Sequence, residues 1–165
     1  MPVTYEPIAT TTLGSAAPSI TFSSITSTYT DLRVVLVCTN ASAGDTYFRF
    51  NGDSGANYSI TALSGSGTSA QTNSPTGMSG INPNQSYGIT STTIPSLMTW
   101  DVFSYGSSAF KTTLCTASQD KNGSGNTIRV VGLWGNTAAI TSITIAPSAN
   151  FNAGTTATLY GIKAA

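Results

Sequence analysis

The sequence predicts an all-β fold, an antiparallel sandwich of two sheets of the jelly-roll type. Short runs rich in β-branched and aromatic residues recur along the chain, turn residues divide them, and no stretch repeats its apolar residues with a helical period. About ten short strands are typical of a two-sheet sandwich, although an immunoglobulin-like sandwich or a small barrel fits the same pattern. The length of 165 residues predicts a single domain over residues 1–165.

The expected strands are bounded by turn residues on both sides and carry the β-rich runs. In chain order they are Tyr5–Leu13, Ser19–Ser23, Leu32–Thr39, Thr46–Phe50, Tyr58–Leu63, Leu97–Ser104, Phe110–Ala117, Thr127–Trp134, Ile140–Pro147 and Thr156–Ile162.

Glycine and asparagine mark the connections, because both residues tolerate a positive φ and close tight hairpins. They occur at Asn51-Gly52, at Gly106-Ser107-Ser108, along Asn122–Asn126 and at Gly135-Asn136. The last is the strongest hairpin signal, since only two residues separate Trp134 from Thr137.

The run Thr127–Trp134 shows the alternation expected of a strand. Ile128, Val130 and Trp134 share one face, whereas Arg129, Val131 and Leu133 share the other. Since both sets contain apolar residues, the pattern predicts a strand in a sheet that is covered on both faces.

One long segment, Ser64–Ser96, interrupts this rhythm. It is rich in Ser, Gly, Asn, Thr and Pro, and only Gly88–Thr92 within it reads as a strand. A loop of this length is usually functional or disordered, and a mobile surface flap is the alternative to a binding loop. We expect its apolar residues and those of the N-terminal arm to contact a neighbouring subunit; the predicted interface residues are Met78, Ile81, Tyr87, Tyr5 and Ile8.

The charge balance bears on the choice of partner. The chain has six basic and six acidic residues, a net charge of zero and a pI near 6.0. Nucleic acid is therefore not an expected partner, because binding phosphates needs a basic stripe. Neither a signal peptide nor an apolar run of membrane-spanning length is recognisable, so we expect cytoplasmic synthesis and no membrane partner. A net charge near zero opposes self-association only weakly.

Catalysis is not expected. The chain contains no histidine, which removes Ser-His-Asp and Cys-His devices and histidine-bound metals. A hydrolase with two carboxylates would need acids at a defined separation, and the six acids are scattered along the sequence. We therefore predict no catalytic, cofactor-binding or metal-binding residue and no cofactor. Asp101, which lies inside a strand, is expected to form hydrogen bonds on a sheet face or to pair with an arginine.

Two further groups of residues have a structural and a chemical interpretation. The Gly-rich loop Asn51–Asn57 offers oxygen ligands that superficially suit calcium, but one carboxylate is too few and Asx-turn chemistry explains the same residues. Cys38 and Cys115 lie in expected strands and are predicted to be free thiols. If Leu36 and Leu114 face the core, the two cysteines belong to opposite faces.

Several stretches carry a resemblance to a known class of proteins. These are TYEPIATTTLGSAAPSITFSSI, YTDLRVVLV, FRFNGDSGANYS, VVGLW, AITSITIAPS, NFNAGTTATLYGI and the final KAA. The chain resembles small virion accessory proteins of tailed bacteriophages, especially those that infect cyanobacteria and other aquatic bacteria. The likeness covers most of the chain and is weakest across Ser64–Ser96. It is a likeness of framework and implies no active site.

The resemblance implies a jelly-roll protein of the virion. One form is a homotrimeric head-decoration (cement) protein that binds the major capsid protein, or another virion protein, and stabilises the capsid from outside. The alternative is a tail-fibre or baseplate module that binds a glycan of the host surface. For that alternative the candidate sugar contacts are Tyr58, Tyr87 and Trp100.

Overall fold

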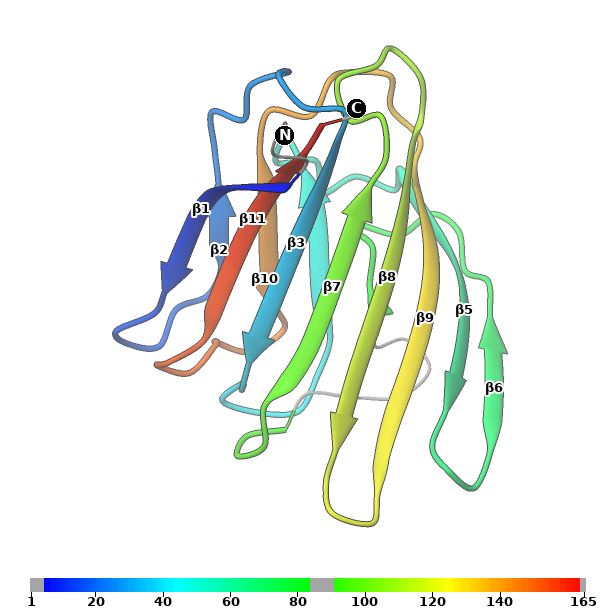
Figure 1. The fold of residues 1–165 in the computed structure, drawn as a ribbon. Helices are drawn as coiled ribbons and strands as arrows, with labels where there is room; N and C mark the ends of the chain where they lie inside the picture. The colour runs from blue at the N-terminus through cyan, green and yellow to red at the C-terminus, as the bar shows by residue number, and fades with distance from the viewer. Residues whose placement is uncertain (1–4, 84–90, 164–165) are drawn as a thin grey trace.

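The computed structural model describes residues 5–83 and 91–163, which form a sandwich of two antiparallel sheets (Figure 1). Their eleven strands divide eight to three between the sheets, and the described residues contain no α-helix. The all-β, antiparallel, two-sheet architecture predicted from the sequence is therefore confirmed. None of the described residues belongs to a helix long and apolar enough to cross a membrane.

The large sheet has the order β1-β11-β3-β7-β8-β9-β5-β6 and the small sheet the order β2-β10-β4. The strands are β1 (Tyr5–Thr12), β2 (Ile20–Phe22), β3 (Asp31–Cys38), β4 (Thr46–Phe50), β5 (Tyr58–Gly65), β6 (Ala70–Asn73), β7 (Ser96–Val102), β8 (Lys111–Asp120), β9 (Gly125–Trp134), β10 (Ile143–Pro147) and β11 (Thr156–Ile162).

All ten expected strands are present, each within a few residues of its expected bounds. The strand β6 was not expected. It pairs with the end of β5, from Ala62 opposite Asn73 to Gly65 opposite Ala70. Its sequence, Ala-Gln-Thr-Asn, has no apolar alternation, because this edge strand buries neither of its faces in the core.

Aromatic side chains join the two sheets. Phe48 on β4 stacks on Trp100 of β7, with 4.7 Å between the ring centroids and an angle of 5° between the planes. Phe50, also on β4, packs against Trp134 of β9 at 5.3 Å and against Tyr58 at 6.3 Å. All five side chains are buried. Burial of each large apolar side chain contributes about 1.5–3 kcal/mol, so this cluster is a main source of stability.

Residues 78–82 pack in the core, whereas Ser74, Thr76 and Gly77 before them are exposed. Ile81 exchanges two backbone hydrogen bonds with Phe48, of 2.9 and 3.0 Å, and Met78 does the same with Tyr58, at 3.2 and 2.9 Å. Gly132 on β9 leaves the space that Ile81 fills, since a Cβ there would lie 2.8 Å from Ile81 Cδ1 and 2.7 Å from Thr113 Oγ1. The predicted strand Gly88–Thr92 lies largely outside the described residues.

Two expectations about β9 were wrong. Val131 and Leu133 are exposed, so the large sheet is covered on one face only. Gly135-Asn136 does not close a hairpin, because the chain leaves β9 at Trp134 and crosses to β10 in the small sheet. The hairpin expected within Asn122–Asn126 is confirmed: Asn122 and Gly123 have φ values of 58° and 101° between β8 and β9.

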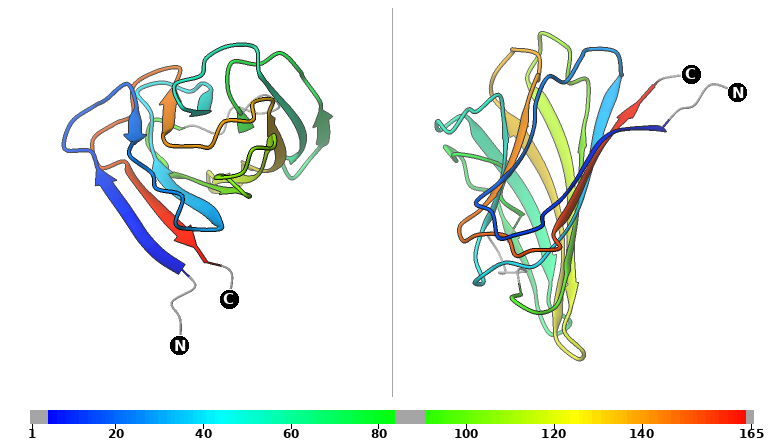
Figure 2. Two further views of the ribbon diagram at one scale, coloured as in Figure 1. Left: turned by 90° about the horizontal axis from the view of Figure 1, so that it is seen from above. Right: turned by 90° about the vertical axis from the view of Figure 1, so that its left-hand side faces the viewer.

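The strands β1 and β11 form one edge of the large sheet. The start of β1 lies beside the end of β11, where Tyr5 pairs with Ile162, and Figure 2 shows this end projecting away from the small sheet. Tyr29 supports it from below, since its ring lies where a Cβ on Gly161 would be, and its hydroxyl donates to Glu6 Oε2 at 3.1 Å. Only glycine at this position lets the ring approach the strand.

Both cysteines are free and buried, as their structural interpretation predicted. The expected assignment to opposite faces was wrong, because Leu114 is half-exposed and Cys115 takes the buried position beside it. Burial raises the pKa of the Cys38 thiol to about 12 and raises that of Cys115 well above its ordinary value. Both thiols therefore stay protonated at neutral pH.

We expect neither thiol to react with a disulfide reagent in the folded protein at pH 8, and both to react after denaturation. Absorbance of the released thiolate measures the count in each state. Rapid reaction of either cysteine without denaturant would contradict the burial of these side chains.

Replacing Gly132 with alanine should destabilise the protein by about 1–3 kcal/mol, because the new methyl group would displace Ile81 or Thr113 in a packed core. Urea denaturation followed by tryptophan fluorescence measures the change. Gly65→Ala is the matched control on β5, since a Cβ there meets nothing closer than 4.0 Å. Equal stability of the two variants would refute this account of the packing.

Candidate interaction surface and cavity

Every one of the six carboxylates accepts a hydrogen bond from another residue of the chain. The donors are Tyr29 and Lys163 for Glu6, Ser104 N for Asp31, Tyr47 for Asp45, Gly55 N, Asn57 and Trp134 for Asp53, Arg33 for Asp101, and Asn122 N for Asp120. The predicted arginine partner of Asp101 is confirmed, with distances of 2.5 Å from Arg33 Nε and 2.7 Å from Arg33 Nη2. The acids thus serve to hold the fold.

Asp53 organises the loop between β4 and β5. Its Oδ1 accepts the Gly55 N–H at 2.9 Å, which is the predicted Asx turn, and its Oδ2 accepts the Trp134 indole N–H at 2.7 Å. The bond from Trp134 is the main cause that lowers the pKa of this carboxyl, and Asn57 and Gly55 add to it. The described residues contain no group of three or more His, Cys, Asp or Glu side chains that could hold a metal ion.

The predicted interface residues have different surroundings. Met78 and Ile81 are 8% and 0% exposed, so the expectation that they contact a neighbouring subunit is corrected: they pack under β4, β5 and β9 in the core of their own chain. Tyr87 lies outside the described residues. Tyr5 and Ile8 on β1 are 39% and 37% exposed and remain available to a partner.

Two of the three aromatic residues considered for sugar binding, Tyr58 and Trp100, are not on the surface, and the third, Tyr87, lies outside the described residues. Trp100 is buried under Phe48, and Tyr58 is buried with its hydroxyl donating to the Asp53 carbonyl and accepting the Phe50 N–H. A glycan therefore cannot stack on either ring without unfolding the core.

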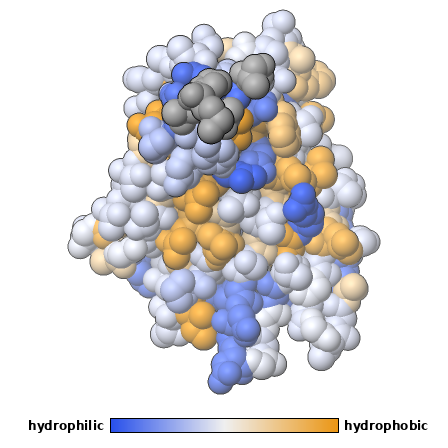
Figure 3. Space-filling model, in the orientation of Figure 1, coloured by the Kyte–Doolittle hydropathy of each residue, from blue (hydrophilic) through white to orange (hydrophobic). Residues whose placement is uncertain are grey.

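An apolar surface that sequence reasoning missed lies on the uncovered face of the large sheet. We name it the outer patch: Leu63 on β5, Leu114 on β8, and Val131 and Leu133 on β9. Leu63, Val131 and Leu133 are 57%, 48% and 37% exposed, and Val131 pairs directly with Leu114. Figure 3 shows apolar side chains over these strands. Their alternation was visible in the sequence, but it was interpreted as burial.

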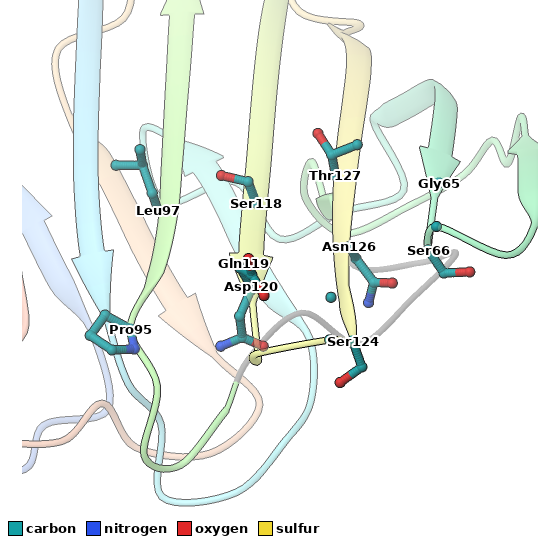
Figure 4. A pocket seen from close by; sticks show the side chains of 13 residues that line it. Gly65, Ser66, Pro95, Leu97, Ser118, Gln119, Asp120, Ser124, Asn126 and Thr127 are labelled. Atoms are coloured by element: carbon teal, nitrogen blue, oxygen red, sulfur yellow. The ribbon is translucent and has the colours of Figure 1, made fainter.

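A cavity of about 770 Å³ opens on the same face, at the ends of β5, β7, β8 and β9 (Figure 4). Its lining consists of Gly65, Ser66, Gly67, Pro95, Leu97, Ser118, Gln119, Asp120, Gly123, Ser124, Gly125, Asn126 and Thr127. Most of these residues are small or polar, and several come from turns. No motif in the sequence points to the cavity, because its shape depends on how β5 is paired with the later strands β7, β8 and β9.

No protein-family model, no curated protein and no solved structure matches the chain. The site must therefore be interpreted from its own geometry.

Replacing Asp53 with alanine should destabilise the fold by about 1–3 kcal/mol at pH 7, since the indole N–H of buried Trp134 would lose its acceptor. Chemical denaturation measures the change, and Asp45→Ala, which removes an acceptor from the half-buried Tyr47, is the control.

The same carboxyl predicts a pH dependence. Because its pKa is lowered by folding, its contribution is present above the ordinary carboxyl pKa and is lost as the pH falls through the lowered value. Asp53→Asn should flatten the decline of stability as the pH falls below the ordinary carboxyl pKa of about 4. An unchanged acid-denaturation curve for Asp53→Asn would show that the carboxylate does not stabilise the fold.

Proposed function

We propose that this chain is a structural subunit of a phage virion, a jelly-roll head-decoration (cement) protein that forms a homotrimer and stabilises the capsid from outside. The observation that carries the proposal is the outer patch, an apolar surface on a rigid sheet that no described part of the chain covers. The resemblance to virion accessory proteins supplies the virion as the setting.

The patch suits contact between copies of the chain. Its three most exposed side chains lie on two adjacent strands, and burying their remaining surface contributes on the order of 2–4 kcal/mol per subunit. Because the residues are held by paired strands, little backbone entropy is lost on association. A net charge of zero adds little repulsion between the copies.

The polar residues around the outer patch are of the kind found at the solvated edge of a protein contact. Arg129, which lies opposite Leu63, donates to Thr116 Oγ1 at 3.3 Å, and the Arg33–Asp101 pair neutralises two charges nearby in the sheet. Paired and hydrogen-bonded charges can remain solvated at the edge of a contact while the apolar residues are covered.

Attachment to the capsid would use the β1–β11 edge. It projects from the sandwich and carries the exposed Tyr5 and Ile8, which are the predicted contacts of the N-terminal arm. Tyr29, Glu6 and Lys163 hold its backbone in place. This edge would bind the major capsid protein while the outer patch joins the copies. With all six acids occupied in structural hydrogen bonds, the proposal assigns the chain no enzymatic role.

A second candidate is a tail-fibre or baseplate module that binds a host glycan. The observation that favours it is the polar cavity at the strand ends.

Sedimentation velocity at about 50 µM tests the assembly. The wild-type protein should sediment as a trimer, and the double variant Val131→Lys/Leu133→Lys should weaken association by at least about tenfold, or 1.4 kcal/mol, because it places like charges at the contact. Phe110→Lys is the matched control, an exposed apolar residue outside the patch.

Binding to phage heads tests the proposal that the protein attaches to a capsid. Wild-type protein and Phe110→Lys should bind heads that lack the decoration protein, and the double variant should bind them more weakly. A monomeric wild-type protein, or a double variant that still forms trimers, would refute the assembly proposal.

A further inference from the structure

The cavity has a floor built by the register of four strands. Leu97 on β7 pairs with Ser118 on β8, Ser118 pairs with Thr127 on β9, and Thr127 pairs with Gly65 on β5. These residues form one row across the outer face. Two of its positions leave space above the sheet, because Ser118 is small and Gly65, at the β5 end of the row, has no side chain.

Two turns form walls of the cavity, and each turn is closed by a backbone hydrogen bond. The β8–β9 turn is closed by a hydrogen bond from Lys121 N to Ser124 O of 2.6 Å, and the β5–β6 turn by one from Ser66 N to Ser69 O of 3.0 Å. On the inner side of the sheet, the Gln119 amide donates to the Ile94 carbonyl at 2.8 Å and so ties the end of β8 to the segment before β7. The hollow is therefore already shaped before a ligand arrives.

The lining offers hydrogen bonds and almost no charge. It contains the hydroxyl groups of Ser66, Ser118, Ser124 and Thr127 and one carboxylate, that of Asp120, and no Lys or Arg belongs to the described lining. Phosphate, sulfate and acidic sugars need a cation, which this lining does not provide. Leu97, which is 45% exposed, and Pro95 add an apolar side against which the C–H face of a sugar ring can pack.

A backbone hydrogen bond orients the carboxylate of Asp120 at the cavity. Its Oδ1 accepts the Asn122 N–H at 2.8 Å, which orients the carboxylate beside the cavity. A carboxylate that accepts from neighbouring hydroxyl groups is a strong, charge-assisted acceptor. The volume of about 770 Å³ lies within the range of small-ligand sites.

From these features we propose that the cavity binds a neutral saccharide, with Asp120 and Thr127 as its polar contacts and Leu97 as its apolar one. The inference goes beyond the assembly role and holds whether or not the outer patch joins subunits. It supplies a site to the glycan-binding candidate in place of the buried Tyr58 and Trp100.

The position of the cavity leaves it accessible. In Figure 1 the β8–β9 turn lies at the lower end of the large sheet, whereas the start of β1 and the end of β11 lie toward the upper end. A subunit attached through Tyr5 and Ile8 would present the cavity at its far end. A saccharide on a cell surface could reach it there.

A glycan array with neutral, sialylated and sulfated oligosaccharides gives the first test, followed by saturation-transfer NMR with maltose, cellobiose and diacetylchitobiose. Neutral saccharides should bind the wild-type protein, and acidic ones should not. Absence of binding to every neutral saccharide, or binding to acidic ones alone, would overturn the proposal.

Two variants locate the site. Gly65→Leu should reduce binding by at least about tenfold, because the side chain would project from the outer face into the cavity. Its Cβ would meet nothing closer than Ser69 O at 4.0 Å, so the fold should tolerate it. Asp120→Asn should weaken binding about fivefold or more through loss of the charged acceptor, while it can still accept the Asn122 N–H.

Matched controls separate this result from folding and from assembly. Gly14→Leu, at a position with open space outside the cavity, and Asp45→Asn should bind saccharide as the wild type does. Circular dichroism checks that each variant folds. If Gly65→Leu does not fold, Asp120→Asn still tests the site. Gly65→Leu should still sediment as the wild type does, so loss of binding can be told from loss of assembly. Unchanged binding in a folded Gly65→Leu or in Asp120→Asn would refute the site.

Discussion

The stacking of Phe48 on Trp100 is the contact on which the rest of the structure depends, because it joins the three-stranded sheet to the middle of the eight-stranded one. Three strands are too few to cover eight. Large aromatic rings fill the difference together with residues 78–82, which bring Ile81 over Gly132. Ala157 and Leu159 of β11 still belong to the core, whereas the start of β1 and the end of β11 extend beyond it, where Tyr29 packs against Gly161.

The strands and several local details could be predicted from the sequence because they depend on neighbouring residues. The period of two and the β-branched residues place ten strands, and Asn122-Gly123 predicts its own positive φ values. Asp101 inside a strand predicted an arginine partner, which is Arg33 on the adjacent strand.

The features that failed depend on residues distant in the chain. Gly135-Asn136 has the composition of a hairpin, but Trp134 and Ile143 belong to different sheets, and a two-residue signal does not contain that information. Met78 and Ile81 look like anchors for a partner, but Met78 pairs with Tyr58 and Ile81 fills the space left by Gly132 within the chain. The alternation in β9 was predicted correctly, but the outer patch was missed because both faces of the large sheet were assumed to be covered. The cavity could not be predicted, because it depends on the register of four strands.

The pairing of β1 with β11 also sets the order in which the chain can fold. Thr12 lies beside Thr156, 144 residues later, so β1 has no strand to pair with until β11 has been synthesised. The meander β7-β8-β9 is local and can form earlier. Non-local closure of this kind makes folding slow and leaves an unpaired strand exposed in the meantime. Pro7 and the bulge beside it interrupt the regular pairing of β1, which limits its use as a template for another nascent chain.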